Sequence, residues 1–420
     1  MSFSTSSRRQ SLRGTLELAV ILACSVPPLL ASCARSSSEK SEGSASQAPP
    51  GQGAQGQAKS AANSCPVAVA GVRKDITLTK ACSPYIQRGG GIDVIDGATL
   101  TIEAGVELRF RDNDWLEIGA AGEPGRLIAK GTAEEPIVFT TQSPETPTTW
   151  LGVWFHSGTL EGSVLSHAVI RRAGGDNRHS KPNLLHGCLT LTGVKPGRLE
   201  ISDVQVENCV NGGVRLTNSH VSFGPLRFVD TGVGFVLDPQ SAGQVPERVG
   251  YRGVTHNVIQ GGVVASNARW APQSVPYVVE GDVSVQGVSA PTLTLPAGLE
   301  LRFAKSRALR VGLDEAGSVR AEGSKEAKVV LTSQVPEETW GGVQLMGKTA
   351  EETRLAFVDV SGVEGDAAIA LRTEPNRVHI SDATFSRNGT DVLVGCKTKP
   401  ILANNRYDSP KGLKREAPCK

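Results

Sequence analysis

The chain is poor in aromatic residues and in net charge. Aromatic residues make up 5% of its 420 positions, and the formal charge is +2. Residues 1–32 hold three arginines and one glutamate, so the rest of the chain has 41 basic and 41 acidic residues. A neutral chain with few aromatic rings lacks the basic patch and the stacking platform that nucleic acids require. We therefore expect no nucleic-acid partner.

Catalytic signatures and long helices are also missing. The sequence contains no HExxH, CxxC or GxSxG motif and no phosphate-binding glycine loop, so it predicts no metal and no cofactor. We find no amphipathic helix of three or more turns after residue 60. The 47 glycines and 24 prolines instead punctuate many short apolar runs. This composition predicts a repetitive all-β protein.

One alternating phrase organises the folded part. Residues 98–110 read ATLTIEAGVELRF, and the phrase returns as PTLTLPAGLELRF at residues 291–303. Alternation with a period of two is typical of a strand that buries one face. We therefore predict that eight apolar residues of the two copies point inward: Leu100, Ile102, Val106, Leu108, Leu293, Leu295, Leu299 and Leu301.

Further phrases recur in the same order. RLIAKGTAEEPIVF at 126–139 corresponds to SVRAEGSKEAKVVL at 318–331, and RLEISD at 198–203 corresponds to RVHISD at 377–382. A sandwich would need about seven strands per ~100 residues, and a propeller a repeat of ~40–50 residues. Neither a sandwich nor a propeller fits a repeat whose two copies begin at residues 98 and 291. Stacked coils fit it, with a first unit at 65–276 and a shortened second unit at 277–420.

The phrases TLTIEAGVELRF, RLIAKGTAEEPIVFT and WLGVWF resemble the repeats of bacterial right-handed parallel β-helix proteins of the pectate-lyase-like superfamily. The resemblance implies a right-handed parallel β-helix with an internal duplication. It implies little about function, because this architecture hosts lyases, hydrolases, adhesins and scaffolds. The second unit departs from the pattern at Ser324, Lys328 and Val329. The matching positions of the first unit are Leu100, Gly105, Phe110, Leu127, Ala129, Gly131, Thr132, Pro136, Ile137, Phe139, Thr140, Trp150 and Gly152.

The N-terminus predicts export and anchoring. Residues 1–32 combine three arginines with an apolar stretch that is too short and too proline-broken to span a membrane well. The stretch ends in LASC, which resembles a bacterial lipobox and implies lipid attachment at Cys33. Residues 33–64 are rich in Ser, Gly, Gln, Ala and Pro, as in a disordered tether. We expect a lipoprotein held at the outer membrane or cell surface of a bacterial envelope.

Residues that only one unit contains are the better candidates for binding. Trp115 and Trp154 could stack on sugar rings, although such residues also cover cores. The polar stretch RRAGGDNRHSKPNLLH at 171–186 has the composition of a loop, and loops on rigid scaffolds often bind ligands. A plain solvated loop remains the alternative. The charged candidates within it are Arg171, Arg172, Asp176, Arg178 and His179.

These features predict a non-catalytic binding, adhesion or scaffold module. Its expected partners are the membrane, through the lipid, and polysaccharide or an envelope protein. The alternative is a polysaccharide lyase or glycoside hydrolase of the β-helix class. A lyase would need clustered carboxylates for Ca²⁺ and a cationic base, and only Asp112 and Asp114 could begin such a cluster.

Six cysteines remain if Cys24 leaves with the signal and Cys33 is lipidated. An oxidising compartment and an even count predict disulfides. Two of the cysteines precede the first repeat and two follow the last, where a solenoid must cover its open ends. The other two lie 21 residues apart, close to one coil. We therefore predict the pairs Cys65–Cys82, Cys188–Cys209 and Cys396–Cys419. The alternative is six unpaired thiols.

Overall fold

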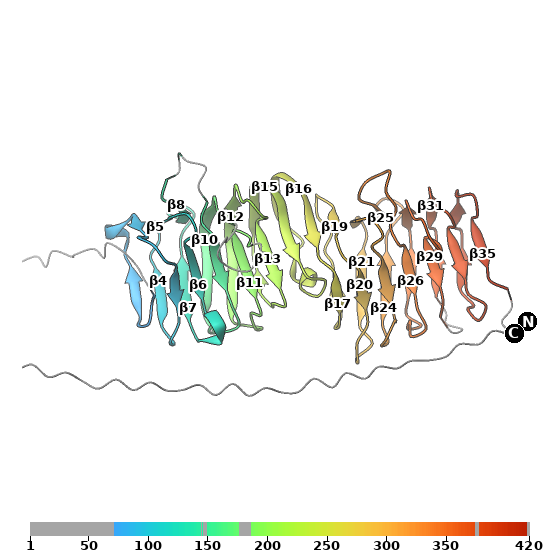
Figure 1. Cartoon of the computed structure of the whole chain (residues 1–420), viewed down its shortest axis with the longest axis horizontal. Coiled ribbons are helices and arrows are strands. Elements are labelled where there is room, and N and C mark those ends of the chain that lie inside the picture. Colours follow the sequence, from blue (N-terminus) through green and yellow to red (C-terminus); the bar gives the residue numbers. More distant parts are fainter. Residues whose placement is uncertain (1–70, 144, 146–148, 176–185, 374–377, 418–420) are drawn as a thin grey trace, which may run out of the picture. The chain divides into compact units, whose positions relative to one another are not determined.

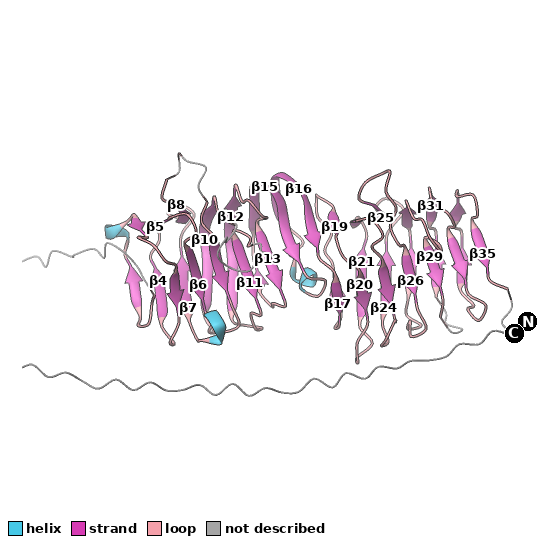
Figure 2. Cartoon of the chain, viewed as in Figure 1, coloured by secondary structure: helices cyan, strands magenta, loops and turns pink. Residues whose placement is uncertain are grey.

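The structure, a computed structural model, describes residues 71–143, 145, 149–175, 186–373 and 378–417. Within these residues short strands stack coil upon coil along one axis (Figure 1), and strands of neighbouring coils pair in parallel. The predicted right-handed parallel β-helix is confirmed. The expected signal peptide at 1–32 and tether at 33–64 lie outside the described residues. Single 3-10 turns interrupt the strands (Figure 2) at Lys80–Cys82, Ala120–Gly122 and Ser241–Gln244.

Three ladders of strands form the first unit. The first ladder contains β1 (Ile76–Leu78), β4 (Thr99–Ile102), β7 (Arg126–Lys130), the first halves of β10 (Ser163–Arg171) and β12 (Leu199–Glu207), and β14 (Ser222–Phe223). The second contains β2 (Tyr85–Ile86), β5 (Glu107–Phe110), β8 (Ile137–Thr141), the second halves of β10 and β12, and the first parts of β15 (Leu226–Leu237) and β16 (Val249–Ile259). The third contains β3 (Ile92–Val94), β6 (Trp115–Ile118), β9 (Gly152–Phe155), β11 (Leu189–Thr192), β13 (Val214–Thr217) and the last parts of β15 and β16.

Inward residues of successive coils form continuous apolar columns. Leu78, Ile102, Ala129, Leu165 and Ile201 pair in sequence along the first ladder, and each is at most 2% exposed. Burying one such side chain contributes about 1.5–3 kcal/mol when it is leucine or isoleucine. All eight residues that the alternation predicts to point inward are also at most 2% exposed, so that prediction is confirmed.

Residues in left-handed backbone conformations turn the chain at the corners. His167 and Asp203 lie at the bends of β10 and β12 with φ of 46° and 54°, and Asp382 has φ of 53° in the second unit. Asp tolerates this conformation better than most residues, because its short side chain can hydrogen-bond to the nearby backbone. The RLEISD and RVHISD phrases therefore recur for a structural reason, since each ends on a corner.

The recurring tryptophans are structural as well. Trp150 stacks on Phe110 with ring centroids 4.2 Å apart, and Trp340 stacks on Phe303 at 4.1 Å. The indole nitrogens donate to backbone carbonyls, Trp150 to Arg171 at 3.0 Å and Trp340 to Ser361 at 2.8 Å. Both tryptophans are at most 1% exposed. The two units thus reproduce the same internal packing.

The second unit is nevertheless shifted by one face of the helix. Its β22, which repeats the ELRF sequence of β5, continues the third ladder rather than the second. That ladder runs on through β19 (Tyr277–Val279), β22 (Glu300–Phe303), β25 (Val329–Ser333), β28 (Val358–Ser361), β31 (Thr384–Ser386) and β34 (Arg406–Tyr407). A new six-stranded sheet comprises β18 (Ala268–Arg269), β21 (Thr292–Pro296), β24 (Ser318–Glu322), β27 (Arg354–Ala356), β30 (His379–Ser381) and β33 (Ile401–Ala403). A new seven-stranded sheet comprises β17 (Gly262–Val264), β20 (Val283–Val285), β23 (Leu309–Val311), β26 (Val343–Leu345), β29 (Ile369–Leu371), β32 (Val392–Val394) and β35 (Leu413–Arg415).

The predicted Cys188–Cys209 disulfide is present, with Cα atoms 5.7 Å apart. Cys188 lies just before β11 and Cys209 just after β12, so the bond joins neighbouring coils. Cys82 and Cys396 are disulfide-bonded too. Their predicted partners, Cys65 and Cys419, lie outside the described residues, and so does Cys33.

Candidate functional site

The two candidate tryptophans lie together on the outside of the third ladder. Trp115 on β6 and Trp154 on β9 are parallel, with centroids 6.0 Å apart and an angle of 2° between the rings. His186 stacks on Trp154 at 4.0 Å. Trp115 donates its indole hydrogen to Asp93 on the preceding coil, at 2.8 Å. Neighbouring coils therefore assemble one aromatic stack, defined by Trp115, Trp154 and His186.

The ring faces of this stack are already in contact with protein. A Cβ atom added to Gly91, on the coil before Trp115, would lie 2.1 Å from the indole ring, so the ring rests directly on that glycine. The opposite side of Trp115 faces Trp154, which is 7% exposed and packs against His186. A sugar ring needs an open aromatic face for stacking. The geometry therefore fits a structural cover better than a binding platform.

The charged candidate residues do not join the aromatic stack in the described part of the chain. Arg171 ends β10 on the second ladder, opposite Glu207, and does not belong to the aromatic stack. Arg172 makes the following corner with φ of 55°, and its backbone N–H donates to the Glu207 carbonyl at 3.0 Å. Asp176, Arg178 and His179 lie outside the described residues. The structure thus brings the tryptophans together but places the two arginines on another ladder.

Asp114 has a structural environment. It is 4% exposed, and its carboxylate accepts the backbone N–H of Arg111 at 3.0 Å. Burial raises the pKa of Asp114, while the hydrogen bonds from the backbone of Arg111 and Gly90 oppose that rise. Asp112, in contrast, is exposed. The two carboxylates therefore do not share one solvent-facing site.

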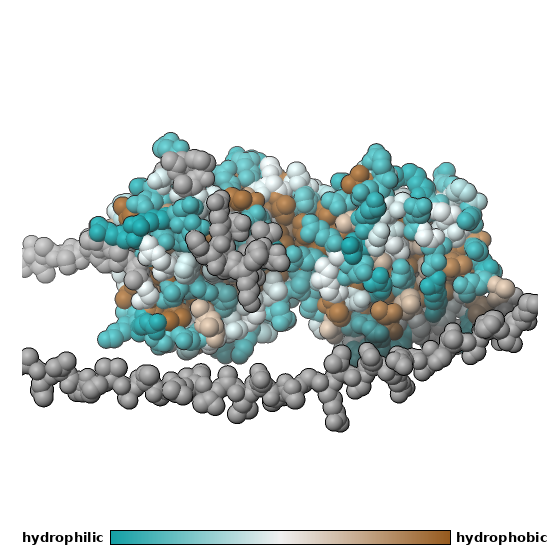
Figure 3. Space-filling view, viewed as in Figure 1, coloured by the Kyte–Doolittle hydropathy of each residue, from teal (hydrophilic) through white to brown (hydrophobic). Residues whose placement is uncertain are grey.

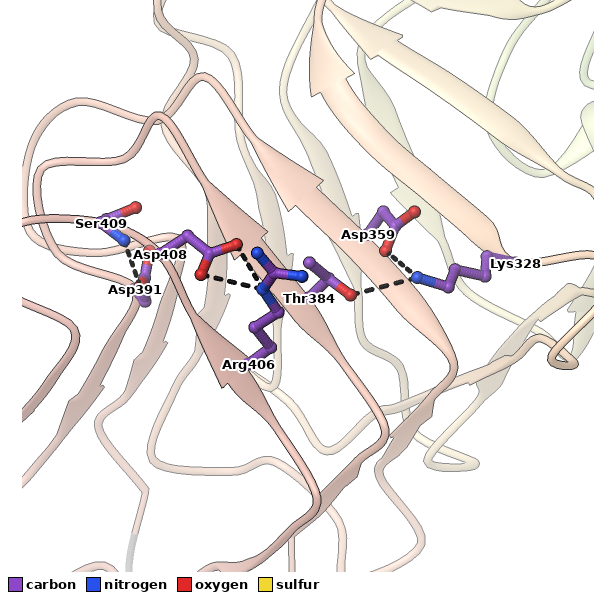
Figure 4. Close-up of polar contacts among 7 residues, drawn as sticks. All are labelled: Lys328, Asp359, Thr384, Asp391, Arg406, Asp408 and Ser409. Atoms are coloured by element: carbon purple, nitrogen blue, oxygen red, sulfur yellow. Dashed lines mark hydrogen bonds and ion pairs between the residues drawn. The ribbon is translucent and has the colours of Figure 1, made fainter.

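The ionisable cluster of the second unit is satisfied within the fold (Figure 4). Lys328 donates to Asp359 at 2.7 Å and to Thr384 at 3.1 Å, and so links three coils. The carboxylate of Asp391 is fully buried and accepts the backbone N–H of Ser409 at 3.1 Å and the amide of Asn388 at 3.0 Å. A buried carboxylate with hydrogen-bond partners, such as Asp391, stabilises one arrangement of the coils, and the partly exposed Lys328 and Asp359 are paired with each other. This cluster is thus structural.

An open groove lies where the two units meet, and we call it the junction groove. One part has a volume of about 670 Å³ and the adjoining part about 380 Å³. The two parts share Gln205, Arg227 and Gly250, which lie opposite one another on β12, β15 and β16. The remaining lining residues are Asp203, Val204, Pro225, Leu226, Val229, Glu247, Arg248, Val249, Tyr251, Arg252, Pro272, Gln273 and Ser274.

The groove arises because the second ladder ends there. In the described part of the chain, residues 249–256 of β16 have a strand partner on the β15 side only, since β19 pairs with Asn257–Ile259 alone. The next coil runs through Pro272 and Pro276, which have no backbone N–H to donate to a ladder. The absence of a paired strand leaves this face of the helix open.

The third ladder instead holds the junction together. Its outward residues Val236, Val258 and Val278 pair in sequence and are at most 6% exposed, although they lie on the outside of the sheet. Figure 3 shows hydrophobic residues gathered on the visible surface over β15, β16 and β19. This ladder is thus apolar on both faces at the point where the other two are interrupted.

Three arginines line the junction groove, and among the described residues one of them has an ion-pair partner and two do not. Arg252 pairs with Asp230 at 3.5 Å, and Glu247 pairs with Arg269 at 3.0 Å. The guanidinium groups of Arg227 and Arg248 form no hydrogen bond or ion pair with any described residue. Gly250 lies opposite Arg227 and two residues after Arg248, and an added Cβ there would meet the Arg227 stem at 3.4 Å and the Leu226 carbonyl at 3.7 Å. The missing side chain at this position keeps the groove open.

Sequence reasoning missed the groove. Only Asp203 among its residues belongs to a repeated phrase, RLEISD, and its polar side chains resemble those of any solvated strand. The available signal was the pair Pro272 and Pro276 within a segment where the repeated phrases are interrupted. Proline in a central strand position argues against continuous pairing. A gap in one ladder could therefore have been inferred, although its lining could not.

The described residues contain no group of three or more His, Cys, Asp or Glu side chains placed to hold a metal ion. Within the same residues no helix has the length and apolar character of a membrane span. Comparison with known proteins found no matching family model, no similar curated protein and no similar solved structure.

Proposed function

We propose that the protein is a non-catalytic, lipid-anchored binding module of the bacterial cell envelope, at the outer membrane or cell surface, and that it binds polysaccharide in the junction groove. The observation that carries the proposal is the groove itself. Its two parts fall within the usual volume range of ligand sites, about 300–1,000 Å³. The LASC motif and the export signal of the sequence support the anchored location.

The chemistry of the lining supports a sugar ligand. Ser274 offers a hydroxyl group and Gln205 an amide oxygen, and the guanidinium groups of Arg227 and Arg248, which have no partner among the described residues, add several donors in planar groups. Sugar hydroxyls both donate and accept, so they suit such a mixed surface. Gln205 and Arg227 lie on paired strands, which fix the positions of their backbones in the groove.

The carboxylates of the groove support binding rather than hydrolysis. Glycoside hydrolysis requires a pair of carboxyl groups that flank the scissile bond and are free to exchange protons. Here Glu247 is ion-paired with Arg269, and Asp203 lies 3.9 Å from His167. Each carboxylate thus has a cationic or ionisable neighbour of its own.

A glycan array tests the proposal. The purified protein should bind at least one polysaccharide, and Gly250→Trp should abolish binding because the indole fills the groove. Gly389→Trp is the matched control, since a Cβ at that exposed glycine meets no atom within 4 Å. Equal binding by both variants would place the ligand elsewhere. An absorbance increase near 235 nm with polyuronides would instead identify a lyase.

A further inference from the structure

A further opening lies beside the junction groove, on the second unit, and we call it the second opening. It has a volume of about 440 Å³. Glu247 lines the junction groove and Arg269 lines the second opening, and these two residues form the 3.0 Å ion pair. The two openings therefore meet at this pair. The lining residues of the second opening are Asn267, Ala268, Arg269, Thr292, Thr294, Arg320 and Glu352.

Both openings follow the axis of the helix. Gln205, Arg227 and Gly250 occupy successive rungs of the second ladder. Arg269, Thr294 and Arg320 occupy successive rungs of the six-stranded sheet that begins on the next coil. Six rungs are separated by five spacings of about 4.8 Å and so span roughly 24 Å, which matches about five sugar rings in an extended chain.

Three of the five arginines that line this path are ion-paired. Arg269 pairs with Glu247, Arg320 pairs with Glu352 at 3.2 Å, and Arg252 pairs with Asp230. Hydroxyl and amide side chains occupy the positions between these pairs. A highly charged polymer would gain little net Coulomb energy from these three pairs, because each arginine has a carboxylate beside it, and of the arginines on this path only Arg227 and Arg248 lack such a partner among the described residues. A polymer of uncharged, hydroxyl-rich rings suits the surface better.

We propose that the junction groove and the second opening form one composite site, which takes an extended neutral polysaccharide lying parallel to the helix axis across both units. This inference rests on the proposed function and adds the ligand class, its direction and its minimum length. A ligand of two or three rings fills the junction groove alone. A ligand of about five or more rings also reaches Thr294 and Arg320.

Three side chains fix the geometry where the units meet. The amide nitrogen of Gln273 donates to the Pro246 carbonyl at 2.9 Å, and the Tyr251 hydroxyl donates to the amide oxygen of Gln273 at 3.3 Å. Asn267 accepts the backbone N–H of Thr292 at 2.9 Å and so ties the start of the second opening to β21. Hydrogen bonds within the fold therefore already orient the side chains that line the proposed path at the junction.

The test measures affinity against chain length, using size-fractionated neutral glucan and xylan oligosaccharides of two to ten rings, with polygalacturonate oligosaccharides as the charged comparison. For wild type we expect the neutral series to gain about tenfold in affinity between three and six rings. Arg320→Ala should remove most of that gain and leave the affinity for three rings unchanged. Arg310→Ala is the matched control, because this arginine is also ion-paired, with Asp282 at 2.7 Å, but lies on the seven-stranded sheet.

The outcomes of this test distinguish failure of the composite site, failure of the neutral ligand class and failure of the proposed function. Affinity that is independent of length, or an equal effect of Arg320→Ala and Arg310→Ala, overturns the composite site but leaves binding in the junction groove intact. Tighter binding of polygalacturonate that weakens steeply with salt overturns the neutral ligand class. Failure of every polymer to bind overturns the proposed function together with this inference.

Discussion

Replacing Cys188 and Cys209 together with alanine should lower the free energy of unfolding by about 3.3 kcal/mol. The bond closes a loop with a sequence separation of 21. In the chain-entropy relation a loop of this length restricts the unfolded chain by about 11 cal/mol/K, which gives the figure above at 25 °C. The two sulfur atoms also leave a buried site, since the residues are 0% and 7% exposed, so a small packing loss adds to it.

Urea unfolding measures this change, followed by tryptophan fluorescence because Trp154 lies directly opposite Thr190, two residues after Cys188. Each single replacement removes the same cross-link as the double one. The two single variants and the double variant should therefore lose nearly equal stability. Losses in the single variants that sum to the loss in the double variant would contradict the cross-link, because independent side chains add and a shared bond does not.

The remaining predictions concern the core, the aromatic stack and the anchor. Leu108→Ala should cost about 2–5 kcal/mol of unfolding free energy in urea melts, and Thr101→Ala on the opposite face far less; equal costs would mean the register is wrong. Gly91→Ala should displace the adjacent indole, lower the stability by about 1–3 kcal/mol and change the near-ultraviolet circular dichroism. Gly347→Ala is its control, since a Cβ there meets nothing within 4 Å, and an unchanged Gly91→Ala spectrum would refute the contact. Cys33→Ala should release the protein from membranes, because a lipid chain contributes about 0.8 kcal/mol per buried CH₂; unchanged membrane fractionation would exclude lipidation there.

The inward columns of the core could be predicted because alternation needs only local sequence. Leu100 and Leu293 could be assigned to the interior from their neighbours alone, and both are fully buried. The spacing of Cys188 and Cys209 similarly approximated one coil. These features depend on the length of a coil and the period of a strand, which the sequence expresses directly.

The candidate site was less accessible to sequence reasoning. Trp115 and Trp154 could be selected as unshared residues, but their contacts depend on the coil before and the coil after. Gly91 and His186 occupy those coils, and sequence distance alone does not give their registers. The junction groove depends in the same way on which face each ladder occupies. The face that each ladder occupies follows from the number of strands between the units, and no single repeated phrase of the sequence gives that number.

The shift of the second unit by one face also has a consequence for how such a helix can be lengthened by duplication of a segment. A duplicated segment needs only to present its apolar side inward and to match the coil height of its neighbour. It can therefore be joined at any of the three angular positions around the axis. A join at a different angle keeps one column of strands continuous, as β16 and β19 do here, and interrupts the other two. Duplication alone can thus create a recess on an otherwise regular rod, before any residue in it has been selected for a ligand.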